Sequence, residues 1–232
     1  MATLKRTMFR EYDIRGKEST DELNEESIYT IARGFGKMLR DAGITDCVVG
    51  HDARTTSESF HAQAQKALTE SGVNCIDIGT VTTPMSYFAQ YHFNVKGLCM
   101  ITASHNPAGW NGLKLGVDLS STLGPADLGH LYTLIEEEDF AGGEGTVRKG
   151  DVKDAYINDL VSRAKLAKPL KVLVNTGNGT AGHRDRGGTQ RGIMCRKKGA
   201  SFGVEQVTPT RYERGVQLGE GSVARELNVL DT

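Results

Sequence analysis

The 232-residue chain has no excess of charge of one sign, no long apolar run and no closely spaced pair of cysteines, and each absence excludes a class of protein. Its 28 basic and 29 acidic residues leave a net charge of −1, which gives no electrostatic case for binding nucleic acid or an anionic membrane. No apolar run reaches membrane-spanning length, and residues 1–6 lead into no apolar signal segment. The four cysteines lack C-x-x-C spacing, as is typical of a reducing compartment. The sequence therefore predicts a cytoplasmic protein without a nucleic-acid or membrane partner.

Segments of strand length alternate with helical patterns between residues 24 and 138. Helices are predicted over residues 24–42, 57–71, 84–91 and 125–138, and strands over 47–49, 73–78, 96–102 and 112–116. Asn24 is the expected N-cap of the first helix. This alternation predicts an α/β fold, in which ligands bind at strand ends. The turns 50–54 and 102–107 both follow predicted strands, so we expect them at one edge of the sheet.

The chain is predicted to hold one complete domain and part of another. A glycine-rich linker over 141–150 separates a first domain, 1–140, from the start of a second α/β domain, 151–182, with a helix over 152–167 and a strand over 171–174. Residues 183–232 contain seven arginines and eight glycines, and show no clear apolar periodicity before residue 215. We expect the second domain to be incomplete and this tail to be disordered or misfolded.

The segment T-A-S-H-N-P over residues 102–107 presents Ser104 in a polar turn directly after an apolar strand. N-G-L-K over 111–114 brings the ammonium group of Lys114 back towards it, and a hydroxyl beside a cation suits a group that carries a phosphoryl. These residues also form ordinary turns, so a purely structural turn stays open. Likewise, Arg15 fits a surface turn and Lys114 a solvated charge on a sheet edge. Asp52 and Arg54 are expected to organise their turn through an ion pair or turn hydrogen bond.

Taken in order, five motifs resemble the α-D-phosphohexomutase family, and its phosphomannomutase/phosphoglucomutase branch in particular. They are F-R-E-Y-D-I-R-G over 9–16, V-G-H-D-A-R over 49–54, T-P at 83–84, T-A-S-H-N-P over 102–107 and N-G-L-K over 111–114. The resemblance runs from about Met8 to Gly182. It implies a three-layer α/β/α first domain with a mixed sheet, followed here by an incomplete second α/β domain. It also implies an isomerase of carbohydrate metabolism that acts as an intramolecular phosphotransferase.

In that family a phosphoserine passes its phosphoryl group to a mannose or glucose phosphate. The sugar bisphosphate then reorients and returns its other phosphoryl group, so that phosphate moves between C1 and C6. The resemblance implies that the substrate here is a phosphosugar, with Mg²⁺ and a sugar 1,6-bisphosphate as cofactor and activator.

The resemblance also assigns roles to residues of this chain. Ser104 takes the role of the catalytic serine. It also takes the role of a metal contact, through the phosphate that it carries. A phosphoserine carries about −1.5 to −2 charges, so cations must surround it. Arg15 and Lys114 take this catalytic and phosphate-binding role. Tyr12 lines the same pocket, and His105 assists in proton or hydrogen-bond work.

The chain departs from the family after Gly182. It contains neither the D-G-D-x-D-R loop whose carboxylates hold Mg²⁺ nor the G-E-x-S-G-H sugar-recognition loop. The rise in arginine and glycine is typical of GC-rich DNA read out of frame, and a genuine short form is the alternative. On either view, we expect negligible mutase turnover from this chain alone.

Two other functions stay open. One is a non-enzymatic phosphoprotein or interaction module that keeps Ser104 as a modification site. The other is a dinucleotide-binding domain, because Gly177–Gly182 fits G-x-G-x-x-G after a predicted strand. That fingerprint requires a helix opening on the glycines, and residues 183–188 offer no apolar helical face.

Overall fold

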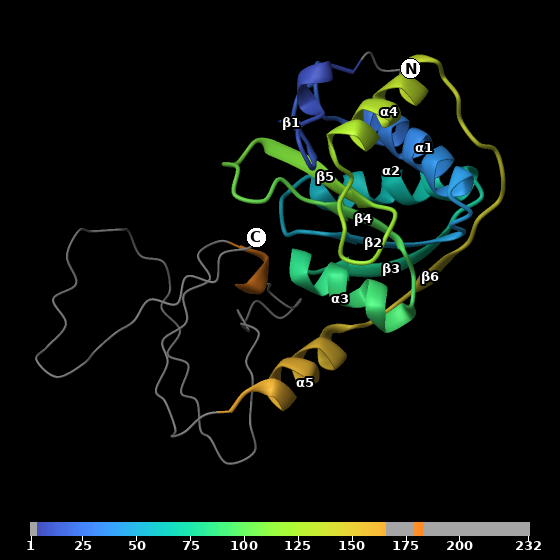
Figure 1. Cartoon of the computed structure of the whole chain (residues 1–232). Coiled ribbons are helices and arrows are strands. Elements are labelled where there is room, and N and C mark those ends of the chain that lie inside the picture. Colours follow the sequence, from blue (N-terminus) through green and yellow to red (C-terminus); the bar gives the residue numbers. More distant parts are fainter. Residues whose placement is uncertain (1–3, 166–178, 183–232) are drawn as a thin grey trace, which may run out of the picture. The chain divides into compact units, whose positions relative to one another are not determined.

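The computed structural model describes residues 4–165 and 179–182 (Figure 1). The chain divides into two units after Tyr156. The first unit is built on a six-stranded sheet in the order β1-β5-β4-β2-β3-β6. Strands β4, β2, β3 and β6 run parallel, whereas β5 is antiparallel to both β4 and β1, so the predicted mixed sheet is confirmed. The strands are β1 (Ile14–Lys17), β2 (Asp46–His51), β3 (Asn74–Thr80), β4 (Gly97–Ile101), β5 (Trp110–Gly116) and β6 (Val147–Lys149).

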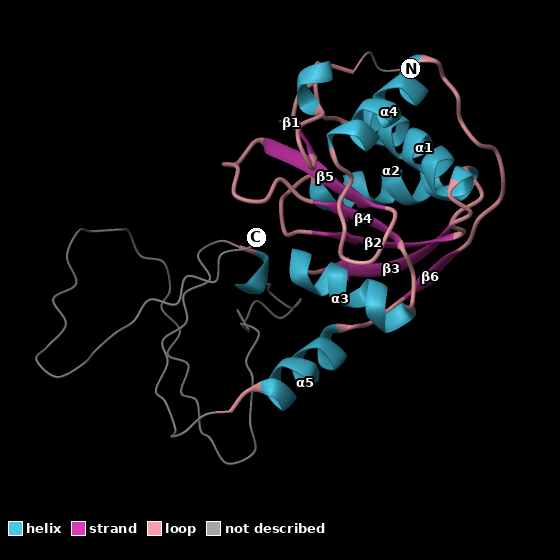
Figure 2. Cartoon of the chain, in the orientation of Figure 1, coloured by secondary structure: helices cyan, strands magenta, loops and turns pink. Residues whose placement is uncertain are grey.

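Helices cover both faces of this sheet (Figure 2). α1 (Glu25–Asp41), α2 (Ser57–Glu70) and α4 (Pro125–Glu136) lie on one face, and α3 (Thr83–Phe93) lies on the other. The predicted three-layer α/β/α domain is therefore confirmed. The chain also forms the 3₁₀ helices η1 (Arg6–Met8) and η2 (Thr180–Gly182) and the helix α5 (Lys153–Arg163). No helix of the described residues is long and apolar enough to cross a membrane.

Helix α1 begins where the sequence predicts. The Asn24 side chain accepts a hydrogen bond from the Ser27 amide at 3.0 Å, and the Ser27 hydroxyl oxygen accepts one from the Asn24 amide at 2.8 Å. This reciprocal capping satisfies two amide groups that the first helical turn leaves unpaired. The apolar side chains of α1 then pack into the core between helices and sheet; Ile28, Ile31, Phe35 and Leu39 are fully buried.

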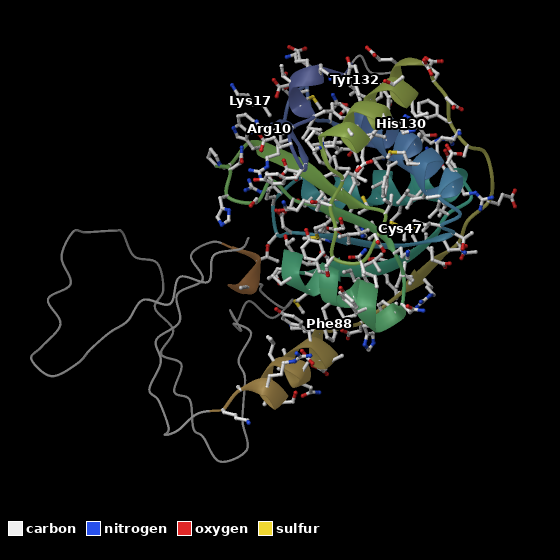
Figure 3. All side chains as sticks on the ribbon, in the orientation of Figure 1. Arg10, Lys17, Cys47, Phe88, His130 and Tyr132 are labelled. Atoms are coloured by element: carbon white, nitrogen blue, oxygen red, sulfur yellow. The ribbon has the colours of Figure 1, made fainter. Side chains whose placement is uncertain are left out.

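Three cysteines lie in the same core. Cys47, Cys75 and Cys99 come from the adjacent strands β2, β3 and β4, and all three are free thiols. Cys47 lies on the central part of the sheet (Figure 3). Burial raises the pKa of Cys75 to about 12 and raises the pKa values of Cys47 and Cys99 as well. These thiols stay protonated near neutral pH and act as small apolar side chains.

Two strands occur where the sequence predicts none. β1 lies inside the opening motif and pairs with β5, and β6 lies inside the segment 141–150, which the sequence predicts to be a linker, and pairs with β3. Both are short strands at the sheet edges, so their pairing depends on distant partners more than on local apolar pattern. The helix predicted over 152–167 is α5, whereas the strand predicted over 171–174 and the tail 183–232 lie outside the described residues.

Candidate functional site

Ser104 lies in the loop that follows β4, and its backbone adopts the left-handed conformation with φ of 55°. Its amide donates a hydrogen bond to the Thr102 hydroxyl at 3.0 Å, and its hydroxyl lies 2.9 Å from Nδ1 of His105. A non-glycine residue persists in this conformation only when its surroundings hold it there, and such residues cluster at functional sites. The fold therefore presents the Ser104 hydroxyl on an imposed backbone geometry, with a base beside it.

The guanidinium of Arg54 imposes that geometry. It donates hydrogen bonds to four backbone carbonyl oxygens of the Ser104 loop and its return into β5: those of Ser104 (3.1 Å), Asn106 (2.5 Å), Pro107 (3.0 Å) and Trp110 (3.1 Å). Only a planar group with several donors can satisfy four carbonyls at once. Arg54 thus fixes the loop through its backbone, independently of the side chains that the loop carries.

Asp52 holds Arg54 in place. Its carboxylate lies 3.2 Å from Nε of Arg54 and accepts hydrogen bonds from the Arg54 amide and, at 2.6 Å, from the Ser57 hydroxyl. The Asp52 amide donates to the carbonyl of Ile101, the last residue of β4, so the two turns lie at one edge of the sheet. Both predictions about these turns, their shared edge and the organising Asp52–Arg54 ion pair, are confirmed.

A buried carboxylate joins the two predicted cations. Oδ2 of Asp13 accepts hydrogen bonds from Nε and Nη2 of Arg15 at 2.9 and 2.7 Å, and Nζ of Lys114 lies 3.4 Å from it. Nη1 of Arg15 donates to the Asn106 side chain at 2.7 Å, which connects this cluster to the Ser104 loop. Arg15 lies on strand β1 and is held by Asp13 and Asn106, so the alternative of a surface turn is wrong. Lys114 lies on the inner strand β5 and is only 7% exposed, so the alternative of a solvated edge charge is wrong as well.

The strand pairing explains how these side chains share one face. Arg15 on β1 is directly opposite Gly112 on β5, and Lys114 is two residues along β5 from that glycine. A Cβ atom at Gly112 would lie 2.2 Å from the carbonyl oxygen of Ile14, so only glycine permits this close approach of β1. The absent side chain also leaves room on the face that carries Arg15 and Lys114.

The turn before β1 shapes a pocket next to these cations. The pocket has a volume of about 530 Å³ and is lined by Phe9, Arg10, Glu11, Tyr12, Asp13 and Arg15. The ring of Tyr12 is half exposed, and its centroid lies 5.0 Å from Nζ of Lys114. Tyr12 and Arg15 therefore line one pocket, and Lys114 contacts it through the Tyr12 ring, whereas Ser104 and His105 are not among its lining residues.

Asp13 is a site residue that sequence reasoning missed. The signal for it was a carboxylate two residues before Arg15, because residues two apart lie on the same side of an extended chain. Burial, and after it the charge of Asp13, raises the pKa of Tyr87 on α3.

The described residues do not provide the metal site that the family resemblance implies. Among residues 4–165 and 179–182, no group of three His, Cys, Asp or Glu side chains could hold a metal ion. Of the glycine-rich run Gly177–Gly182, residues 177 and 178 lie outside the described part, Gly179 is a bend, and Thr180–Gly182 form the three-residue η2, too short for an anion-binding helix terminus.

Comparison with known proteins places this arrangement in a family. Residues 6–142 match the family model for phosphoglucomutase/phosphomannomutase, alpha/beta/alpha domain I. The chain is 40% identical to a phosphomannomutase of Escherichia coli over 185 residues, covering 76% of this chain and 40% of that protein. It is 33% identical to a phosphoglucomutase of Neisseria gonorrhoeae, covering 78% of this chain and 40% of that protein.

Solved structures agree. The crystal structure of a phosphoglucomutase/phosphomannomutase family protein from Burkholderia thailandensis matches with a TM-score of 0.72 and 30% identity. That match covers 78% of this chain and 41% of the other. The chain thus spans about two fifths of the length of the relatives that it matches.

Proposed function

The chain belongs to the phosphoglucomutase/phosphomannomutase family, and on this premise we propose that it is the phosphoserine-bearing portion of an α-D-phosphohexomutase. The proposed reaction moves phosphate between C1 and C6 of glucose or mannose phosphates, in the cytoplasm, through a sugar 1,6-bisphosphate. The observation that carries the proposal is the geometry of Ser104. Its hydroxyl adjoins His105, and its loop is held by Arg54 and tied through Asn106 to the cation Arg15.

These residues support one phosphoryl transfer in each direction. Oγ of Ser104 bonds to the phosphorus of a sugar phosphate while the bond from that phosphorus to the sugar oxygen breaks. The serine proton passes to Nδ1 of His105, 2.9 Å away, and from there to the departing sugar oxygen. Charge spreads over the three equatorial oxygens during transfer, and Arg15 and Lys114 supply positive charge on that side.

This chain alone would carry only part of the catalytic machinery of such a mutase. Residues 1–140, together with β6 of the segment 141–150, would form the domain that carries the site, and 151–182 would begin a second domain, before a tail of unrelated sequence over 183–232. Mg²⁺ is proposed as the cofactor of the whole reaction, but the described residues offer it no ligand set. Without the carboxylate and sugar-recognition loops, we expect single transfers to be slow and turnover to be negligible.

The test is phosphorylation of Ser104 by glucose 1,6-bisphosphate. We expect mass spectrometry of the purified chain, incubated for hours, to find one phosphoryl group, and peptide mapping to place it on Ser104. Ser104→Ala should remain unmodified while keeping its melting temperature, and Ser120→Ala is the matched control, since Ser120 is another serine with positive φ. A folded wild-type chain that never gains phosphate on Ser104 would overturn the proposal. Robust Mg²⁺-dependent turnover of glucose 1-phosphate, lost in Ser104→Ala, would overturn only its claim of inactivity.

A further inference from the structure

Arg10 is the cation of the pocket that neither the motif reading nor the proposed transfer uses. It stands at one end of the turn that precedes β1, where its amide donates a hydrogen bond to the Asp13 carbonyl at 2.9 Å. Its guanidinium carbon lies 5.7 Å from the centroid of the Trp110 ring, within the range of a cation–π contact. Stacking on an aromatic ring orients a guanidinium while leaving its N–H donors free to bind a ligand.

Trp110 connects Arg10 to the reactive serine. Its ring holds the guanidinium of Arg10, and its carbonyl oxygen accepts a hydrogen bond from Arg54 at 3.1 Å. The same guanidinium of Arg54 binds the carbonyl oxygen of Ser104. One residue at the start of β5 therefore contacts both the group that positions Ser104 and the cation at the pocket wall.

The charges of the pocket show why Arg10 is needed. Its lining contains two arginines, Arg10 and Arg15, and two carboxylates, Glu11 and Asp13. Asp13 is bound by Arg15, whereas no ion pair joins Arg10 to a carboxylate within the described part of the chain. Without Arg10, the lining would hold one arginine against two carboxylates and would repel an anion.

We propose that Arg10 is a phosphate-binding residue of this site, which takes the phosphate group of the sugar phosphate entering the pocket. The inference rests on the proposed function and extends it, since it names the group that receives the substrate rather than the group that reacts. Arg15 and Lys114 share Asp13, so together they leave one net positive charge in this cluster, which Asn106 ties to the Ser104 loop. A phosphate on Ser104 and a phosphate on the sugar exceed that charge, and the planar fork of Arg10 offsets part of the difference.

The test is titration of glucose 1-phosphate into the purified 232-residue chain by isothermal calorimetry. Mass spectrometry first establishes that Ser104 is unphosphorylated, so only the sugar's phosphate is measured. Arg10→Ala should weaken binding roughly 10- to 100-fold, as expected for losing a charge-assisted hydrogen-bonding group. Arg10→Lys should recover part of the loss, and Glu11→Gln should bind more tightly than wild type. Trp110 is the single tryptophan of the chain, so its fluorescence should respond to glucose 1-phosphate and not to glucose.

Arg6→Ala is the matched control. Arg6 is also exposed and also stacks on an aromatic ring, with its guanidinium carbon 4.6 Å from the centroid of Tyr132, but it does not line the pocket. It should bind as wild type does. Equal affinity of Arg10→Ala and wild type, with wild type binding, would overturn the role of Arg10 and leave the proposed function intact. No binding of glucose 1-phosphate by the folded wild type would overturn both.

Discussion

Replacing Arg54 should uncouple the Ser104 loop from the sheet. Arg54→Lys keeps the positive charge but replaces a planar group with several donors by one ammonium, which cannot reach the four carbonyl oxygens that Arg54 now binds. Ser104 would then lose the contacts that hold it at a φ of 55°, a conformation that costs about 1–3 kcal/mol. We expect the loop to relax and the hydroxyl to leave its reactive position.

The magnitude follows from the contacts. A hydrogen bond to a charged group contributes about 1.5–3 kcal/mol, but the four bonds are not additive, because carbonyls of a relaxed loop regain water. Asp52 also loses the guanidinium Nε that lies 3.2 Å from it, although it keeps the hydroxyl of Ser57. Together these effects predict a loss of about 2–4 kcal/mol in the free energy of unfolding. A displacement of about 1 Å at a reacting atom can slow a reaction 100-fold, so Ser104 phosphorylation should slow roughly 10- to 100-fold.

Urea denaturation measures the first effect, and the initial rate of Ser104 phosphorylation by glucose 1,6-bisphosphate measures the second. Arg40→Lys is the control, because Arg40 is exposed and donates to a single carbonyl oxygen, that of Gly72, at 3.3 Å. Its free energy of unfolding should stay within about 0.5 kcal/mol of wild type. If Arg54→Lys matched wild type in both measurements, the idea that Arg54 positions Ser104 would be refuted.

Three further substitutions test other parts of the account. Burial lowers the pKa of His61, so below about pH 6.5 the unfolded chain binds a proton that the folded chain excludes. The free energy of unfolding should therefore fall by up to about 1.4 kcal/mol for each unit by which the pH is lowered in that range. His61→Gln should flatten that slope in urea titrations between pH 5 and 7, and an unchanged slope would refute the assignment. Gly112→Ala should destabilise the fold by about 1–3 kcal/mol, because the added methyl group clashes with the β1 backbone. Gly142 lies in open space, so Gly142→Ala should leave the melting temperature unchanged. Equal effects of the two substitutions would contradict the close packing of β1 against Gly112. Asp13→Asn should cost about 3 kcal/mol by leaving the buried Lys114 and the partly buried Arg15 without their carboxylate, and inorganic phosphate should restore part of that loss. A stability that responds neither to the substitution nor to phosphate would contradict the shared ion cluster.

Local sequence information predicted the elements whose signals are local. The Asn24 cap and the apolar periodicity that follows predict α1, and strands between polar turns predict β2 to β5. β1 and β6 were missed because each is short and is defined by pairing with a strand far along the chain. A four-residue strand carrying two cations has no apolar alternation for a local reading to detect.

The candidate site also has features that local sequence predicts and features that only the fold defines. Motif reading identified Ser104, Arg15 and Lys114 and predicted the Asp52–Arg54 ion pair. It could not show that one carboxylate, Asp13, binds both cations, because that follows from the β1–β5 register. Motif reading also could not predict the four carbonyl oxygens that Arg54 binds, because a sequence does not reveal where backbone groups point.

The central claim is that Ser104 exchanges phosphoryl groups with a sugar, rather than carrying a regulatory phosphate. The most direct measurement gives glucose 6-phosphate to the chain phosphorylated on Ser104 and follows both molecules by mass spectrometry. The account predicts that Ser104 loses its phosphoryl group as glucose 1,6-bisphosphate forms in equal amount, whereas buffer or glucose leaves the phosphoserine intact. A phosphoserine that stays intact with glucose 6-phosphate, or that releases only inorganic phosphate, would contradict it.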